Sequence, residues 1–421
     1  MDKNFINYHI LISHSPSCLN RDDMNMQKSA IFGGKRRVRI SSQSLKRTIR
    51  TSDYYETKFG EASIRTKHLD LLKDEFLKDE EIKKEYSDVI QDALERFVKT
   101  QVTTEENDDD QSDEEKEKKP EKKLAVAPWI KEEFKILCRI VKEVREAGLT
   151  PEEKEKAQKD HDKQKKPKKG EKKPPEYFEG QIIDKKIEAK MKDNKKALLA
   201  AVASAKDVAL SGRMATSGLM TTIDGALAVA HVITTHAVDA DIDWFTAVDD
   251  LQELGSGHLD TQEFSSGVFY RYASLNLKQL QLNLGLIPDI DSGETQESRN
   301  AALDIAKHLL HLLTTEVPSA KQQSFAAHNL ADLAMVSFSD MPVSLANAFE
   351  EPVKASAGGG FLKPSVDALH AYWGKIHTGY GLDERTAVFS ISKKPPELMT
   401  EKKTLAELEN WVKNNGIETA R

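Results

Sequence analysis

The apolar positions along the chain alternate between the two-residue period of strands and the longer period of helices. Residues 5–12 are mostly β-branched or aromatic and predict an opening core strand, which the turn-forming residues 13–17 should end. Residues 268–272 alternate in the manner of a strand, and runs of small and β-branched residues at 225–233 and 333–338 are typical of buried strands. The pattern therefore predicts strands that lie far apart in the sequence.

Helical spacing fills much of the chain between these strands. The predicted helices cover residues 43–50, 69–99, 130–144, 197–210 and 301–316. Strands and helices follow no regular β-α-β alternation, which argues against a parallel sheet with crossover helices. We therefore predict an α+β fold around a small antiparallel sheet.

Two stretches with few apolar residues interrupt the helical part. Residues 101–123 hold ten acidic residues and five lysines, and residues 154–173 hold ten lysines and four acidic residues. Neither stretch can bury enough apolar surface to offset the loss of chain entropy, so we expect both to be mobile insertions. A lysine-rich track that guides DNA is a second interpretation of residues 154–173.

A basic segment near the start of the chain is the clearest sign of function. Residues 24–52 contain eight Lys or Arg residues and no acidic residue, whereas the whole chain carries a formal charge of −7. Hydroxyl and amide side chains alternate with these cations, and this combination suits the binding of successive phosphate groups. The segment predicts a nucleic-acid interface, and an ordinary solvated surface is the alternative.

The end of this segment predicts a short helix with two distinct faces. Ser41 can cap a helix that begins near Gln43. Leu45 and Ile49 are four residues apart and share an apolar face. The other face carries three cations, Lys46, Arg47 and Arg50.

Composition and motifs exclude several classes of protein. The chain has 421 residues and only two cysteines, without a CxxC motif, which argues against disulfide scaffolds, zinc ribbons and iron-sulfur sites. Apolar runs are far shorter than the roughly 20 residues that span a bilayer, so we expect a soluble cytoplasmic protein with no membrane partner. No phosphate-binding loop, nucleophile elbow or dinucleotide-binding motif occurs.

Clustered carboxylates and imidazoles could form a catalytic metal site. The cluster comprises His231, His236, Asp239, Asp241, Asp243, Asp249 and Asp250. Its acidic part begins like a calcium-binding loop, but Trp244 occupies the position where glycine makes the turn. A solvated acidic loop is the preferred interpretation, and a metal-dependent endoribonuclease is the alternative.

Two further pairs of residues could contact nucleic acid. Arg213 and Met214 could place a cation and an apolar wedge beside a nucleic-acid backbone, although a single Met is more often core filler. Trp244 and Phe245 are adjacent in a predicted loop, and they could stack on bases or anchor the loop.

Several long strings resemble one family. The strings are SHSPSCLNRDD at 13–23, IFGGKRRVRISSQSLKR at 31–47, LSGRMATSG at 210–218, DIDWFTAVDD at 241–250 and QEFSSGVFYRY at 262–272. Together they resemble the CasC family, the crRNA-binding backbone subunit of the type I-E CRISPR Cascade complex. The resemblance covers roughly residues 4–69 and 207–416 and is much weaker between them.

The resemblance implies an RRM-like (ferredoxin-like) palm with an inserted helical finger domain and a thumb hairpin. The implied division is palm at 1–69, finger region at 70–205 with the charged insertions 101–123 and 154–173, palm strands at 206–231, thumb at 232–263 and palm at 264–421. No RNP1 string is present, so the likeness to an RRM is one of fold only.

The resemblance also implies a non-catalytic role without cofactor or metal. Copies of the chain would form a helical filament, a hexamer in this family, along a crRNA and present the guide to a target DNA strand for antiviral defence. The other implied partners are the large, small, 5′-end cap and crRNA endonuclease subunits of Cascade. A protein-only scaffold that does not bind RNA is a further alternative.

The resemblance assigns roles to individual residues. The positions implied to hold the crRNA backbone are Arg21, Lys28, Ser41, Gln43, Lys46, Arg47 and Arg50. Arg213 and Met214 match a pair beside the displaced nucleotide. The positions implied to form the thumb tip are Trp244, Phe245, Thr246 and Val248.

Overall fold

A computed structural model describes residues 2–102, 126–163, 173–214, 222–248 and 256–418. The chain divides into two compact units. The first comprises residues 1–60, 226–282 and 286–421, and the second comprises residues 61–225 and 283–285. Over the described ranges, no helix is long and apolar enough to cross a membrane.

The first unit contains the sheet and the helices that cover it. Its strands are β1 (Phe5–Ser17), β2 (Ser29–Phe32), β3 (Lys35–Ile40), β6 (Leu227–Val229), β7 (Val232–Thr234), β8 (Asp241–Val248), β9 (Ser256–Asn276), β10 (Leu333–Ser339), β11 (Arg385–Ser390) and β12 (Thr400–Lys402). Its helices are α1 (Ser42–Arg50), α2 (Asp53–Phe59), α11 (Leu277–Asn283), α12 (Gln296–Thr315), α13 (Gln322–Phe325), the 3-10 helix η2 (Ala346–Phe349), α14 (Leu362–Tyr380) and α15 (Leu405–Lys413).

The described strands of the first unit form one ten-stranded sheet, which confirms the α+β class. The strand order is β12-β11-β10-β1-β9-β7-β3-β2, and β6 and β8 both pair with β9. All of these pairs are antiparallel except β11 with β12. The prediction of a small sheet was wrong, because the 21-residue strand β9 serves as a common partner for four other strands.

Strand β1 continues beyond the predicted turn. Ser13 and His14 pair with Val268 and Gly267 of β9, and the irregularity comes only between His14 and Ser17. Pairing with a long neighbouring strand therefore overrides the local turn preference of residues 13–17.

Helices cover both faces of the central strands. On one face, Leu11, Tyr270 and Met335 pack with Leu369 and Trp373 of α14 in a buried apolar cluster. The other face is covered by α12, which accepts a hydrogen bond from the Tyr8 hydroxyl at Ala306 O, 3.0 Å away. Strand β1 is therefore buried on both faces, as its almost continuous apolar composition predicts.

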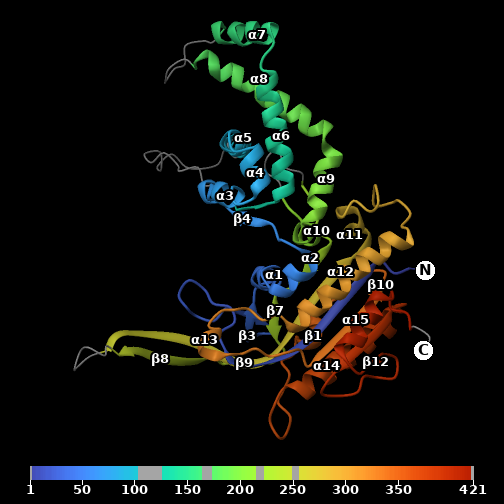
Figure 1. Cartoon of the computed structure of the whole chain (residues 1–421). Coiled ribbons are helices and arrows are strands. Elements are labelled where there is room, and N and C mark those ends of the chain that lie inside the picture. Colours follow the sequence, from blue (N-terminus) through green and yellow to red (C-terminus); the bar gives the residue numbers. More distant parts are fainter. Residues whose placement is uncertain (1, 103–125, 164–172, 215–221, 249–255, 419–421) are drawn as a thin grey trace. The chain divides into compact units, whose positions relative to one another are not determined.

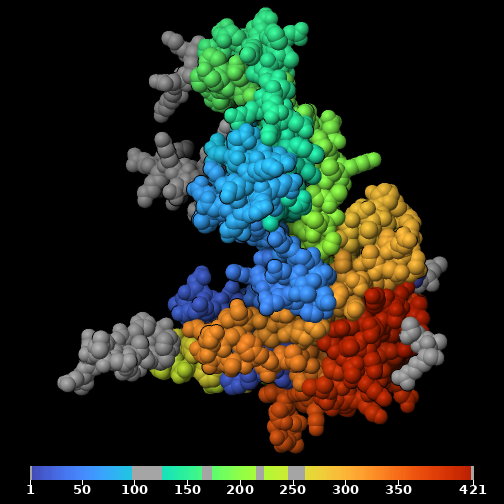
Figure 2. Space-filling view, viewed as in Figure 1, coloured from blue at the N-terminus to red at the C-terminus, as the bar shows by residue number. Residues whose placement is uncertain are grey.

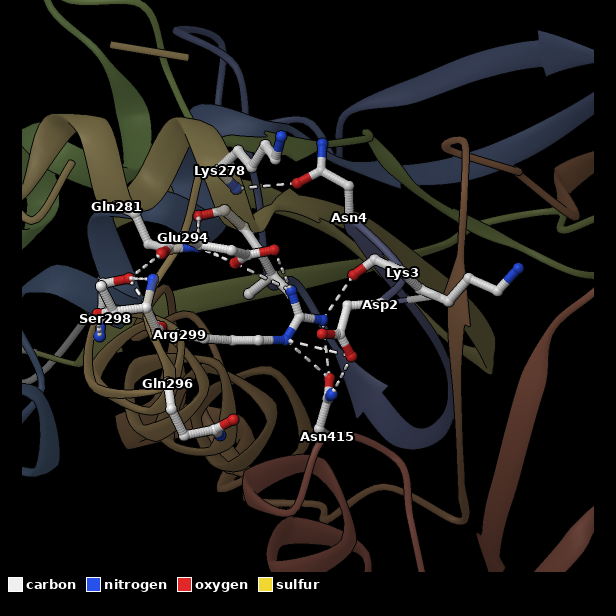
Figure 3. A network of polar contacts seen from close by, with 12 residues as sticks. Asp2, Lys3, Asn4, Lys278, Gln281, Glu294, Gln296, Ser298, Arg299 and Asn415 are labelled. Atoms are coloured by element: carbon white, nitrogen blue, oxygen red, sulfur yellow. Dashed lines mark hydrogen bonds and ion pairs between the residues drawn. The ribbon is translucent and has the colours of Figure 1, made fainter. Parts of the chain in front are cut away.

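A polar network around Arg299 ties the start of the chain to α12 and to the end of α15 (Figure 3). The Arg299 guanidinium donates to Glu294, to the carbonyl oxygen of Lys3 at 2.7 Å and to Asn415 Oδ1 at 2.8 Å. Asn415 in turn donates to Asp2. Arg299 is almost fully buried, so its charge is stabilised by these partners.

The second unit is mainly helical. Its helices are α3 (Leu69–Phe76), α4 (Glu80–Glu85), α5 (Ile90–Val102), α6 (Lys131–Ala147), α7 (Pro151–Asp162), α8 (Pro175–Asp193), α9 (Lys195–Ser204) and α10 (Lys206–Ser211). The strands β4 (Ile64–Thr66) and β5 (Ala127–Trp129) form a two-stranded sheet. Phe134, Leu137 and Val141 of α6 lie in its main apolar cluster, as their helical spacing predicts.

The charged stretches differ in part from the prediction of mobile insertions. Residues 103–125 and 164–172 lie outside the described residues. Residues 154–162, however, belong to helix α7, which begins with a capping box between Thr150 and Glu153 and has Pro151 in its first turn. Local capping and the burial of Ala157 therefore order a segment whose average composition suggested disorder.

Residues 206–225 group with the second unit, whereas the sequence-based division placed residues 206–231 in the palm. The reason is packing, because Val208 and Ile223 form a buried cluster with Ile130 and Val202. The palm, finger and thumb roles themselves stay predictions.

Candidate nucleic-acid interface

Helix α1 has the two faces that the sequence predicts. Ser41 is the N-cap, and its hydroxyl accepts a hydrogen bond from Ser44 N at 3.2 Å. Leu45 and Ile49 are buried and anchor the helix. The opposite face leaves Gln43 and Arg47 exposed, while Lys46 and Arg50 are half-buried. The helix therefore holds a row of cations on a fixed support.

The loop before β2 is anchored to the N-terminus of α1. Asn20 Oδ1 accepts a hydrogen bond from Ser41 N at 2.8 Å, and Asn20 O accepts one from Lys28 N at 2.9 Å. Arg21 is exposed and donates to Asn25, and Lys28 is half-buried. Asn20 thus holds the loop that carries Arg21 and Lys28 against the cap of α1, a role that sequence reasoning missed.

Two arginines of the basic segment are held by protein groups. Arg37 is buried and donates to the carbonyl oxygens of Thr234, Phe349 and Glu350 at 2.9 to 3.2 Å. Arg36 forms an ion pair with Glu263 at 2.6 Å. The count of eight cations therefore overstated the charge available to a ligand.

The first of the two glycines between β2 and β3 is required by a close approach of two backbones. Gly33 has a φ of 57°, and a Cβ built on it would lie 1.7 Å from Glu350 O. Only glycine fits this close approach of two backbones. The turn therefore holds the β2-β3 hairpin against residues 349–350, whose carbonyl oxygens also accept hydrogen bonds from Arg37.

A cavity of about 470 Å³ lies between α1 and the segment that follows α12. It is lined by Leu19, Asn20, Arg21, Ser44, Arg47, Thr48, Thr51, Ser52 and residues 316–320. In Figure 2, the orange surface around α13 lies directly below the blue surface that includes α1. Arg21 and Arg47 thus face one opening that is otherwise lined mainly by small polar groups.

One acidic residue, Glu316, lines this cavity. Its side chain is half-buried, and burial raises the pKa of the carboxyl above its usual value. The Asp53 carboxylate raises this pKa further, while His311 and Arg271 lower it. The cavity therefore combines cations with a single desolvated carboxyl group.

The predicted thumb residues lie on a β-hairpin. Strand β8 pairs with the first part of β9, and Trp244 lies opposite Thr261 (Figure 1). The prediction of a loop at Trp244 and Phe245 was wrong, because the eight residues of β8 are paired along β9. Trp244 is 67% exposed, so it does not anchor a core.

The remaining thumb residues are described by their backbone alone. Phe245, Thr246 and Val248 follow Trp244 on β8. Residues 249–255, which include Asp249 and Asp250, lie outside the described residues. The assignment of these positions to a thumb tip stays a prediction.

The predicted pair of Arg213 and Met214 separates in the structure. Arg213 is buried in the second unit and donates to both carboxylate oxygens of Glu133, at 2.5 and 2.8 Å. Met214 is 87% exposed. The cation of the pair is thus engaged in an ion pair, while the apolar side chain stays available for contact.

The two histidines of the alternative metal cluster hold backbone groups. His231 Nδ1 accepts from Ser42 N at 3.1 Å at the start of α1. His236 is buried, stacks on Phe361 and accepts at Nε2 from Val268 N at 3.2 Å. Burial lowers the pKa of His236. Among the described residues, no group of three or more His, Cys, Asp or Glu side chains could hold a metal ion.

Comparisons with known proteins relate this chain to one protein family and to solved structures. The family model for CT1975-like proteins matches residues 6–414. A chain of a pre-nicking CRISPR RNA-guided surveillance complex is 26% identical, with a TM-score of 0.68, and the match covers 98% of this chain and 100% of that chain.

A second solved structure agrees in fold. A chain of a CRISPR RNA-guided surveillance complex is 21% identical, with a TM-score of 0.53, over 97% of this chain and 98% of that chain. None of the curated proteins compared with the chain matches it.

Proposed function

We propose that this chain, which belongs to the family of CT1975-like proteins, is a crRNA-binding backbone subunit of a CRISPR surveillance complex. Its likeness, at 26% identity over nearly the whole chain, to a chain of such a complex supports this role. The finer assignment, to the backbone subunit of a type I-E Cascade complex, rests on the strings at 31–47 and 241–250.

The observation that carries the proposal is the cavity between α1 and residues 316–320. Arg21 and Arg47 both line it, and the helix that presents Arg47 is anchored by Leu45 and Ile49. Arginine binds phosphate through a planar fork of donors, which suits a sugar-phosphate backbone. Gln43, Lys46 and Arg50 lie on the same short helix and extend the contact surface.

This arrangement favours binding that is independent of sequence. Phosphate contacts fix the position of a nucleic acid but carry no information about its bases. A guide holder needs this property, because it must leave base edges free to pair with a target DNA strand. We infer that the chain holds the guide by its backbone, that Trp244 and Met214 contact bases, and that Arg213 supports the second unit.

We further propose that the chain is not an enzyme and acts as one of several copies along the crRNA. The histidines that a metal-dependent ribonuclease would use, His231 and His236, are hydrogen-bonded to backbone groups. Neighbouring copies in a helical filament, the other Cascade subunits and target DNA are the expected partners. We expect this assembly to act in the cytoplasm.

Copurification tests the proposal directly. The protein expressed with a CRISPR array and the other subunits should retain RNA of one uniform length, and Arg21→Ala/Arg47→Ala should retain less. Incubation with Mg²⁺, Mn²⁺ or a chelator should leave that RNA intact. Specific cleavage lost in Asp243→Asn would instead support the endoribonuclease, and wild-type protein that retains no RNA would support a protein-only scaffold.

A further inference from the structure

The cavity beside α1 offers hydrogen-bond acceptors as well as cations. Thr48 Oγ1 donates to Ser44 O at 3.0 Å, and Thr51 Oγ1 donates to Arg47 O at 3.0 Å. Since each hydroxyl has one proton, only acceptor lone pairs remain on these two oxygens. These lone pairs cannot bind a phosphate oxygen, which is itself an acceptor, so they require a donor on the ligand.

Glu316 adds a stronger acceptor in the opposite wall. Among the described residues, its carboxylate has no ion pair and no side-chain hydrogen bond. It lines both the 470 Å³ cavity and a neighbouring cavity of about 680 Å³. It thus stands where the two cavities meet.

The backbone of Glu316 is held firmly in this place. Its N–H donates to Leu312 O at 3.0 Å, and its carbonyl oxygen accepts from the buried Arg271 at 2.8 Å. Arg271 also donates to Leu313 O at 3.0 Å. The backbone that carries this half-buried carboxylate is therefore fixed before a ligand arrives.

We propose that Glu316 makes this cavity selective for RNA over DNA by accepting a hydrogen bond from a ribose 2′-hydroxyl. The inference rests on the proposed function and deepens it. Arg21 and Arg47 bind a phosphate, and the acceptors of Glu316, Thr48 and Thr51 face the adjoining sugar. The 2′-hydroxyl is the donor that distinguishes RNA from DNA at such a site.

Charge repulsion between the Glu316 carboxylate and phosphate strengthens the discrimination between RNA and DNA. A carboxylate repels phosphate, so Glu316 keeps phosphates on the side of Arg21 and Arg47 and leaves its own side to sugars. Deoxyribose would bury the Glu316 carboxylate without a donor, and a polar group left unpaired in a binding site lowers affinity strongly.

The test compares ligands that differ only at the 2′ position. Full-length protein is titrated with oligo-uridine RNA, oligo-deoxyuridine DNA and 2′-O-methyl oligo-uridine, all of the same length and at the same salt concentration. Wild type should bind the RNA about tenfold or more tightly than either other ligand, the loss typical for a hydrogen bond to a charged group. Glu316→Ala should bring the RNA affinity close to the DNA affinity, and Glu316→Gln should give an intermediate ratio.

Two controls keep the result interpretable. Glu397→Ala removes an exposed carboxylate outside the cavity and should keep the wild-type ratio. Glu316→Gln should melt at a higher temperature than wild type at pH 7, because the raised pKa means that the charged form opposes folding. This measurement shows that lost selectivity does not come from a damaged fold.

The possible outcomes separate the two proposals. Equal binding of RNA and DNA by wild type, or an unchanged ratio in Glu316→Ala, overturns the selectivity of Glu316 and leaves the proposed function in place. Wild type that binds none of the three ligands overturns the proposed function, and the selectivity with it.

Discussion

Arg213 and Glu133 form a bidentate ion pair inside the second unit, although 80 residues separate them in the sequence. The Arg213 side chain is completely buried, and that of Glu133 is 7% exposed. Glu133 lies in the first turn of α6, and Arg213 follows α10. The pair therefore joins the start of α6 to the segment that follows α10.

Breaking this pair should unfold or loosen the second unit. Glu133→Gln and Arg213→Ala should each lower the free energy of unfolding by about 3–5 kcal/mol, because each leaves the partner charge buried and uncompensated. Glu132→Gln, which changes the exposed neighbour, should change it by about 0.5 kcal/mol or less. Denaturant unfolding and hydrogen exchange in α6 measure the effect. Lost RNA binding with unchanged stability in Arg213→Ala would instead favour direct contact with RNA.

Arg47 and Arg37 should respond differently to the same substitution. Arg47→Ala should weaken crRNA binding equally for unrelated guides. The slope of the logarithm of the binding constant against the logarithm of the salt concentration should become shallower by about 0.7, as expected for one lost phosphate contact. Arg37→Ala should instead lower the melting temperature, because Arg37 donates to three backbone carbonyls. Binding measured over a salt series, with thermal melts, checks both. A loss that depends on the guide sequence would mean that Arg47 contacts bases.

Local signals in the sequence were sufficient for helix α1. The cap at Ser41 and the spacing of Leu45 and Ile49 act within a few residues, and the structure has the helix where they predict it. Helix α7 carried an equally local signal in Thr150 and Glu153. The average composition of residues 154–173 does not show this signal, because the capping residues precede the charged stretch.

The structural features that the sequence did not predict depend on partners that are distant along the chain. Strand β8 exists because β9 pairs with it, and Arg37 is buried because residues 349–350 supply its acceptors. Asn20 and Glu316 join the site only when the chain has folded, and no spacing along the sequence indicates that either lies beside α1. Ionic and hydrogen-bonded pairs between distant segments depend on geometry that spacing along one chain cannot give.

Trp244 should set a regular pattern on the bound guide. Trp244→Ala should blur the periodic accessibility of crRNA bases in the assembled complex, since stacking on an aromatic ring is worth about 1–3 kcal/mol per base. The salt dependence of binding should change little, because the indole is uncharged. Ile242→Ala is a matched control, since Ile242 is also exposed and lies two residues earlier on β8. A sharp periodic footprint in Trp244→Ala would show that Trp244 does not act as a wedge.

His9 is held neutral in the core. Its Nδ1 lies within hydrogen-bond distance of Tyr270 Oη, 2.8 Å away, and Tyr270 Oη also accepts a hydrogen bond from Leu345 N at 3.1 Å. Burial lowers the pKa of His9 to about 3, and that of the buried His14 also to about 3. Both histidines are therefore neutral in the folded protein at pH values where the unfolded chain would bind a proton.

This difference should make the protein less stable in mild acid. Between pH 6.5 and about 3 the unfolded state binds more protons than the folded state, so stability falls as the pH drops below 6.5 and is fully present above it. Each such histidine contributes at most about 1.4 kcal/mol per pH unit. Unfolding free energies from pH 7.5 to 4.5 should fall less steeply in His9→Gln than in wild type. His328→Gln, at an exposed position, should keep the wild-type slope. An equal slope in wild type, His9→Gln and His328→Gln would show that His9 is not protonated on unfolding.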